Sequence, residues 1–188
     1  MKNLAFAFLM AVGMIVVGAT TASAQMMNGN PMVGGAAMDK KKNIVENAMN
    51  SKDHTTLVAA IKAAGLVDTL MGRGPFTVFA PTNAAFDMLP AGTVDTLLKP
   101  ENKAMLSSIL TYHVVAGKMD SKAIMKAIKK GNGKAMLTTV EGGMLTAMMD
   151  GSTLVLTDEK GGKSRVTIAN VKQSNGVIHV VDSVLMPN

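Results

Sequence analysis

The chain contains no cysteine and no tryptophan, and only one tyrosine and five phenylalanines among its 188 residues. Without cysteine it can form no disulfide, thiolate metal ligand or cysteine-based catalytic group, so its stability must come from packing. The shortage of aromatic side chains also argues against stacking on bases, and we expect no nucleic-acid partner. The length suffices for one globular domain with its own core.

Long hydrophobic runs are scarce too, and the longest one lies at the amino terminus. Lys2 precedes an uncharged run over residues 4–18, and Ala22 and Ala24 supply small residues for a cleavage site. The run is shorter than the ~20 residues that a membrane-spanning helix needs, although an uncleaved anchor is the alternative. We therefore predict a signal peptide over residues 1–24, a secreted or periplasmic protein, and no stable membrane insertion after cleavage.

The remaining chain is modestly basic. The predicted signal peptide holds one of the 19 Lys and Arg residues, so 18 remain against 13 Asp and Glu, and 18 − 13 gives a net charge of +5. A positive balance of this size permits contact with acidic polysaccharide or anionic lipid.

Residues 25–42 combine glycine, proline and asparagine without a helical or strand period. This composition predicts a flexible linker, followed by a folded domain over residues 43–188.

Methionine is unusually frequent, with 18 residues in the chain. Four of them lie in the predicted linker: Met26, Met27, Met32 and Met38. Thioethers bind Cu(I) and react with oxidants, so a periplasmic copper-binding or redox-buffering protein is an alternative function for the chain. Elsewhere we expect methionine to fill the core in place of leucine, for example at Met105, Met125 and Met186.

The two halves of the domain carry different patterns. Short helical segments, each opened by a capping residue and closed by glycine or proline, extend to about Lys130. From about Lys134 onward, apolar and β-branched runs alternate with turn dipeptides, including Asp150-Gly151 and Asn175-Gly176, which predict hairpins. This separation favours an α+β domain.

The segment Phe76–Ala80 reads as a strand inside the helical half, so it must pair with the later sheet. Phe76 and Phe79, with Phe86 beyond the turn, are expected to join the helices to the sheet. Alternation along the last strand places His179 on the same face as Val177 and Val181, as part of the core.

Three stretches in this order, "GPFTVFAPTNAAFDMLP", "LTYHVVAGKM" and "SNGVIHVVDSVLMP", closely resemble the fasciclin (FAS1) domain family, and the resemblance extends over residues 43–187. It implies a wedge-shaped β-sandwich with short helices packed at one edge. It also implies a secreted or surface protein that takes part in adhesion to cells, matrix or polysaccharide, and that is not an enzyme.

The resemblance also points to Tyr112 and His113, because a Tyr-His pair with branched apolar neighbours has been linked to integrin recognition in animal matrix members. Here the match is "YHVV". The two residues are therefore candidate binding residues, and internal packing is the alternative.

Catalytic patterns are missing. No G-x-S-x-G elbow occurs, and the Gly-Lys pairs lack the upstream glycine of a phosphate-binding loop. His54 precedes a helix and is expected to be exposed. We expect no enzyme activity and no cofactor, and we predict an adhesion or interaction module for surface polysaccharide or an envelope or matrix protein.

Overall fold

The structure is a computed structural model that describes residues 26, 27 and 29–188, so the predicted signal peptide lies outside the described residues. The helices are α1 (Ile44–Ala48), α2 (Thr55–Ala64), α3 (Val67–Met71), α4 (Asn83–Asp87), α5 (Thr93–Leu97), α6 (Lys103–Tyr112) and α7 (Ser121–Lys130), with 3-10 turns at Lys52–His54 and Pro100–Asn102. The strands are β1 (Met26–Met27), β2 (Asn30–Val33), β3 (Ala36–Ala37), β4 (Phe76–Pro81), β5 (Val114–Ala116), β6 (Lys134–Thr138), β7 (Met144–Asp150), β8 (Thr153–Thr157), β9 (Lys163–Gln173) and β10 (Gly176–Val181). Helices dominate the first half and strands the second, which confirms the α+β prediction.

Local signals set several helix ends. Gly65 ends α2 in the left-handed region, with φ 73°, where glycine carries no steric penalty. The Thr82 side chain accepts a hydrogen bond from Ala85 N and caps α4, and Asp120 caps α7 in the same way. No described helix is both long and apolar enough to cross a lipid bilayer.

The main sheet has seven strands in the order β5-β4-β10-β9-β8-β7-β6. β4 and β10 pair in parallel, with Phe79 opposite His179, and every other pair is antiparallel. The two edges meet where Val115 bridges Thr139 and where Val140 N donates to Val114 O at 2.7 Å. The sheet is therefore bent almost into a barrel.

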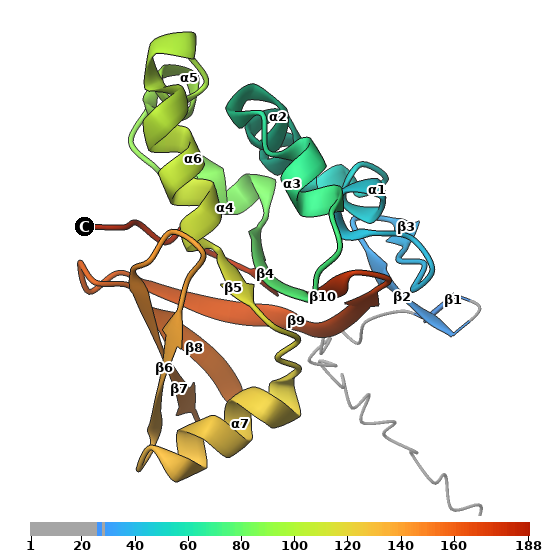
Figure 1. Cartoon of the computed structure of the whole chain (residues 1–188), viewed down its shortest axis with the longest axis vertical. Coiled ribbons are helices and arrows are strands. Elements are labelled where there is room, and N and C mark those ends of the chain that lie inside the picture. The colour runs from blue at the N-terminus through green and yellow to red at the C-terminus, as the bar shows by residue number, and fades with distance from the viewer. Residues whose placement is uncertain (1–25, 28) are drawn as a thin grey trace, which may run out of the picture.

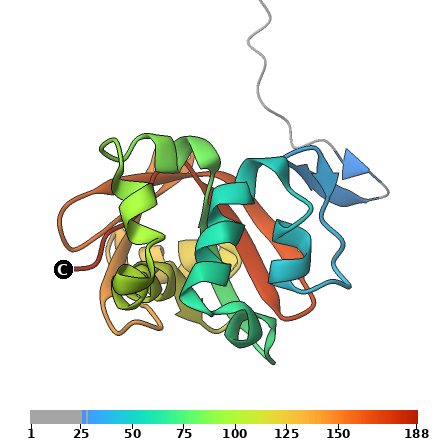
Figure 2. The ribbon, with the colours of Figure 1, turned by 90° about the horizontal axis from the view of Figure 1, so that it is seen from above.

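Helices α1–α6 gather on one side of β4 and β10 (Figure 1). Seen from above, they cover the length of the domain, and the small β1–β3 sheet lies at one end (Figure 2). α7 lies at the opposite end of the molecule, against β6 and β7.

The predicted linker over residues 25–42 is wrong for most of its length. β2 pairs with β1 and β3, and Val33 and Met38 are buried in the core. Lys52 N also donates to Gly34 O at 3.0 Å. The glycines of this segment therefore form a tight turn between short strands, and the folded unit begins before Asn43.

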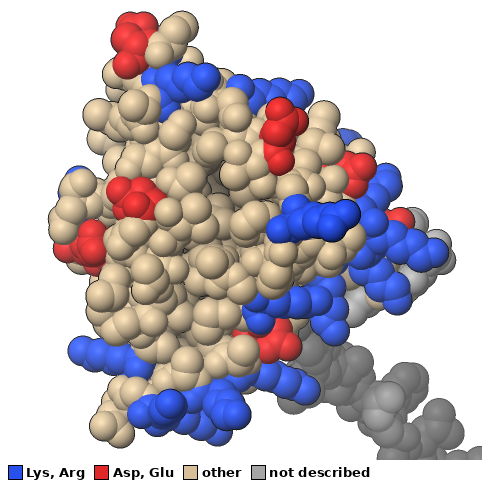
Figure 3. Space-filling model, in the orientation of Figure 1, with Lys and Arg blue, Asp and Glu red and all other residues tan. Residues whose placement is uncertain are grey.

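Charged side chains are unevenly distributed on the face shown in Figure 3. Lys and Arg gather along its right side and lower edge, over the β3–α1 connection and α7, while acidic side chains are fewer and scattered over the face. The four lysines of α7 are exposed, as its helical pattern predicts: Lys122, Lys126, Lys129 and Lys130.

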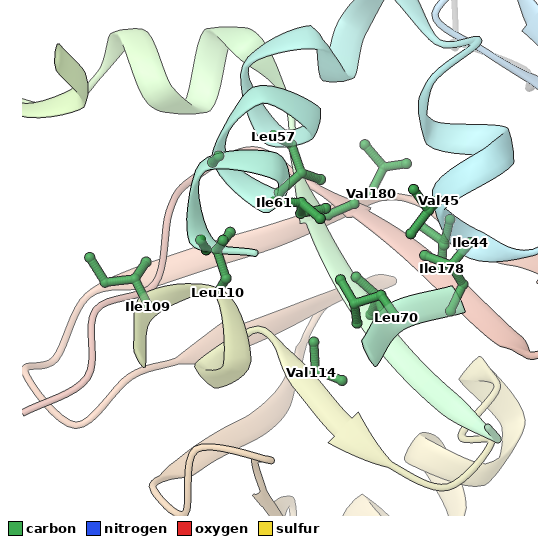
Figure 4. Packing of buried hydrophobic residues seen from close by; sticks show 14 of the residues in the cluster. Ile44, Val45, Leu57, Ile61, Leu70, Ile109, Leu110, Val114, Ile178 and Val180 are labelled. Carbon is green, nitrogen blue, oxygen red and sulfur yellow. The ribbon is translucent and has the colours of Figure 1, made fainter. Parts of the chain in front are cut away.

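Two hydrophobic clusters lie on the two faces of β4 and β10. The helix-side cluster includes Val78, Ile178 and Val180 with residues from α1, α2, α3 and α6, and Figure 4 shows its packing. The other cluster fills the bent sheet and includes Phe79 and Val181. Strand alternation explains this division, because successive side chains point to opposite faces.

This arrangement confirms β4 as an interior strand that joins the two halves. It also refines the predicted role of the three phenylalanines, because Phe76 and Phe86 pack on the helix side and Phe79 packs on the other. The expectation that Met105 and Met125 fill the core is wrong, since both are exposed on helix faces that point to solvent. Met186 packs against the core, as expected.

Candidate binding groove

A groove of about 450 Å³ lies between the α3–β4 loop and the β9–β10 turn. Arg73 and Pro75 line it from the loop, Ser174 and Asn175 from the turn, and Lys118 from the segment after β5. Asn43, directly before α1, also lines it, so four stretches of chain that are distant in sequence form one surface feature.

Asn175 holds this groove together. Its amide Nδ2 donates to Leu70 O at 2.7 Å and to Gly72 O at 3.1 Å. Its Oδ1 accepts from Ile44 N at 3.1 Å. One side chain thus fixes the end of α3, the loop that follows it and the start of α1.

The glycines of the groove permit close backbone approaches. A Cβ on Gly74 would lie 2.0 Å from Asn175 O, and one on Gly176 would lie 2.1 Å from Phe76 O. Neither Asn175 nor Gly176 has a positive φ, so this dipeptide does not form the type I′ turn that the sequence suggested. Glycine is required at positions 74 and 176 because the two backbone segments approach too closely to leave room for a Cβ.

Two cationic side chains, Arg73 and Lys118, line the groove, and both are exposed. Within residues 29–188, the one ion pair joins Arg165 to Asp150, so neither Arg73 nor Lys118 is paired with a described carboxylate. The described lining contains no carboxylate, histidine or tyrosine. Its side chains can attract and orient an anion.

Tyr112 lies inside the domain. It is fully buried, its hydroxyl donates to Met144 O at 2.8 Å, and it accepts from Glu159 N at 3.2 Å. Burial raises the pKa of Tyr112 above its ordinary value. The side chain joins α6 to β7 and to the loop after β8.

His113 is buried beside it and joins α6 to the carboxyl-terminal segment. Its Nδ1 lies 2.8 Å from Ile109 O, and its Nε2 lies 3.0 Å from Leu185 N. A carbonyl only accepts and an amide N–H only donates, so Nδ1 carries the proton and Nε2 accepts. Burial lowers the pKa of His113 to about 4. Neither Tyr112 nor His113 lies on a surface that a partner could contact directly.

The other two histidines are also buried. His179 stacks on Phe79 with ring centroids 5.6 Å apart, and its Nε2 lies 2.9 Å from Met119 O, so it is a core residue as predicted. The predicted exposure of His54 is wrong, because it is 3% exposed beside Val33 and Met38. The segment that covers His54 is the one that the sequence suggested was a linker. Burial lowers the pKa of His54 and of His179.

The four methionines considered for copper do not form one exposed set. Met38 is 2% exposed and packs in the core, while Met32 is half-buried in β2. Met26 and Met27 form β1, and their side chains lie outside what the structure describes. Among the described residues, no three His, Asp or Glu side chains are grouped for a metal ion.

Sequence reasoning missed the groove. Its local signal is an arginine between two glycines directly before the β4 strand, in "GRGPF". This pattern indicates a tight loop with an exposed arginine. It cannot indicate the groove, because the other lining residues come from distant segments of the chain.

The elements form an α+β domain with a nearly closed sheet. A solved structure of a FAS1 domain pair from the insect cell adhesion molecule fasciclin I shares this fold, with a TM-score of 0.68 and 18% identity, over 77% of this chain and 51% of that chain. The sequence model of the fasciclin domain matches residues 52–187. The chain therefore belongs to the fasciclin domain family.

Curated bacterial relatives support this assignment. Protein sll1483 of Synechocystis sp. is 46% identical, over 83% of this chain and 79% of the relative. The immunogenic protein MPB70 of Mycobacterium bovis is 39% identical, over 74% of this chain and 66% of the relative. The cell surface glycolipoprotein MPB83 of the same species is 36% identical, over 94% and 74%.

Proposed function

We propose that this protein is a non-enzymatic adhesion module, secreted or periplasmic, that binds acidic polysaccharide through the groove between α3–β4 and β9–β10. The observation that carries the proposal is the pair of exposed, unpaired cations, Arg73 and Lys118, on a backbone held by Asn175. Fasciclin-domain proteins are known as adhesion-type modules, and the names of the relatives above place one at a cell surface and another in cell adhesion.

The chemistry of the groove favours a polymer of uronic acids. Repeated carboxylates complement two cations, and sugar hydroxyls can pair with the polar groups of Asn43 and Ser174, which also line the groove. The cations are exposed, so each contact is weak and depends on salt. Many such contacts along one polymer, from many copies of the protein, would supply the strength that adhesion needs.

The test is binding of the purified protein to a polyuronate and to neutral dextran, at low and at high salt. The double variant R73Q/K118Q should weaken polyuronate binding about tenfold, which corresponds to roughly 1.4 kcal/mol. The matched control, K126Q/K129Q, removes the same charge from α7 outside the groove and should bind within about twofold of wild type.

Equal losses in the two double variants would mean that only net charge matters, and the groove would then have no specific role. Binding to an envelope protein that the groove variant leaves intact would contradict the polysaccharide proposal as well. Circular dichroism of both variants shows whether they fold, which we expect because all four side chains are exposed.

A further inference from the structure

The large hydrophobic side chains exposed on this domain are almost all methionine. In the part of the chain that the structure describes, eight large hydrophobic side chains are exposed, and seven of them are methionine. The seven, with their exposed fractions, are Met49 (54%), Met71 (44%), Met88 (71%), Met105 (59%), Met125 (37%), Met136 (60%) and Met144 (40%). The eighth is Val140.

Leucine, isoleucine and phenylalanine behave differently in the same structure. Every described Leu, Ile and Phe side chain is buried or half-buried. Methionine as a substitute for leucine in the core therefore does not explain these seven positions. At these seven positions the chain exposes a thioether, whereas it exposes no described leucine, isoleucine or phenylalanine.

Five of the seven methionines lie in or at the end of five different helices, and Met136 and Met144 lie near each other on the paired strands β6 and β7. The seven thus lie in or next to seven different elements, which are α1, α3, α4, α6, α7, β6 and β7. An apolar docking surface would collect such side chains on one face. This distribution over several helices and one strand pair instead lets a small solute reach most of the thioethers independently.

We propose that the folded domain is a sacrificial scavenger of two-electron oxidants of the hypohalous acid class. In each event, a methionine thioether takes the oxygen of hypochlorous acid. One S–O bond forms and the O–Cl bond breaks, while chloride leaves and the proton passes to water. The sulfur loses two electrons and becomes a sulfoxide, and the oxidant gains both electrons.

The fold tolerates this chemistry because of where the sulfur atoms lie. A sulfoxide is polar, and at an exposed position its oxygen is hydrated without disturbing the core. Met38 is the contrast, since it is 2% exposed and packs in the helix-side cluster. Oxidation there would place an unpaired polar group in an apolar site. The described part of the domain therefore has seven exposed thioethers, each able to give up two electrons, that should react before its core is damaged.

The experiment titrates the purified protein with hypochlorous acid and assigns sulfoxides by peptide mass spectrometry, with circular dichroism at each step. We expect the seven exposed methionines to be converted first, Met88 among the earliest and Met38 last, with the melting transition retained until the seven are consumed. Oxidation of Met38 in step with Met88, unfolding during the first equivalents, or lysine chloramines appearing before the exposed sulfoxides would each overturn the proposal.

The matched control replaces all seven exposed methionines by leucine, which changes side-chain volume little. This variant should fold, and it should consume less oxidant than wild type before Met38 reacts. A reporter enzyme that hypochlorous acid inactivates supplies the second measurement. Wild type should spare the enzyme and the leucine variant should not, whereas equal protection by both would refute the scavenging role. If the variant does not fold, the order of oxidation in wild type still decides the matter.

Discussion

Acid should destabilise this domain through His113. The folded state holds this side chain neutral, with Nδ1 donating to Ile109 O and Nε2 accepting from Leu185 N. A proton on Nε2 would point at the N–H of Leu185, which is also a donor, and would place a positive charge in the core. The folded state therefore resists protonation of His113. The unfolded chain accepts a proton with the ordinary histidine pKa of about 6.5.

The size of the effect follows from the two pKa values. The pKa of His113 is about 4 in the folded protein. Because the folded pKa lies below the unfolded one, the unfolded state binds more protons between about pH 6.5 and pH 4, and the free energy of unfolding falls as pH falls. The difference amounts to about 3 kcal/mol between pH 7.5 and pH 4. His54 and His179, whose pKa values are also lowered, act in the same direction.

The assay is urea unfolding at steps of pH, followed by circular dichroism and by the emission of Tyr112, which is the only tyrosine in a chain without tryptophan. The comparison is with H113Q, whose amide can accept from Leu185 N but has no titrating proton. H113Q should be less stable than wild type at pH 7.5, and its stability should fall by about 3 kcal/mol less on acidification. The same pH dependence in both proteins would refute the reasoning.

Three further substitutions test the packing. Phe79→Ala removes a fully buried ring that stacks on His179 and should cost about 3–5 kcal/mol in urea unfolding, and a loss below about 1 kcal/mol would contradict an interior β4. Gly74→Ala places a Cβ 2.0 Å from Asn175 O and should cost about 1–3 kcal/mol and weaken polyuronate binding, which unchanged melting and affinity would disprove. Tyr112→Phe leaves two backbone groups without their partner and should cost about 1–3 kcal/mol, whereas a change within about 0.5 kcal/mol would mean that water replaces the hydroxyl.

Much of the fold could be predicted because its signals are local. The β4 strand is a short run of β-branched and aromatic residues between glycine and proline. The end of α2 depends on Gly65 alone, because glycine adopts the left-handed conformation without a steric penalty. The alternation of β10 placed His179 correctly, since a strand period needs no knowledge of its neighbours.

The errors fall where distant segments meet. Residues 30–38 form strands too short for a period to be visible, and their burial depends on a sheet face supplied by β9 and β10. The burial of His54 follows from the same contact, because Val33 and Met38 lie against it. The groove has the same origin, since Asn175 bonds Leu70 across 105 residues of chain. No local pattern encodes such a pairing.

The positions of Tyr112 and His113 change how their substitution should be interpreted in any adhesion assay. Both side chains bond elements that are distant in sequence, so replacing either one alters the fold and can reduce binding without any loss of direct contact. Arg73 and Lys118 are exposed and make no described ion pair, so replacing them changes the surface alone. A reduction of binding in R73Q/K118Q at unchanged stability therefore identifies a contact surface. The same reduction in Tyr112→Phe has that meaning only after its loss of stability has been measured and taken into account.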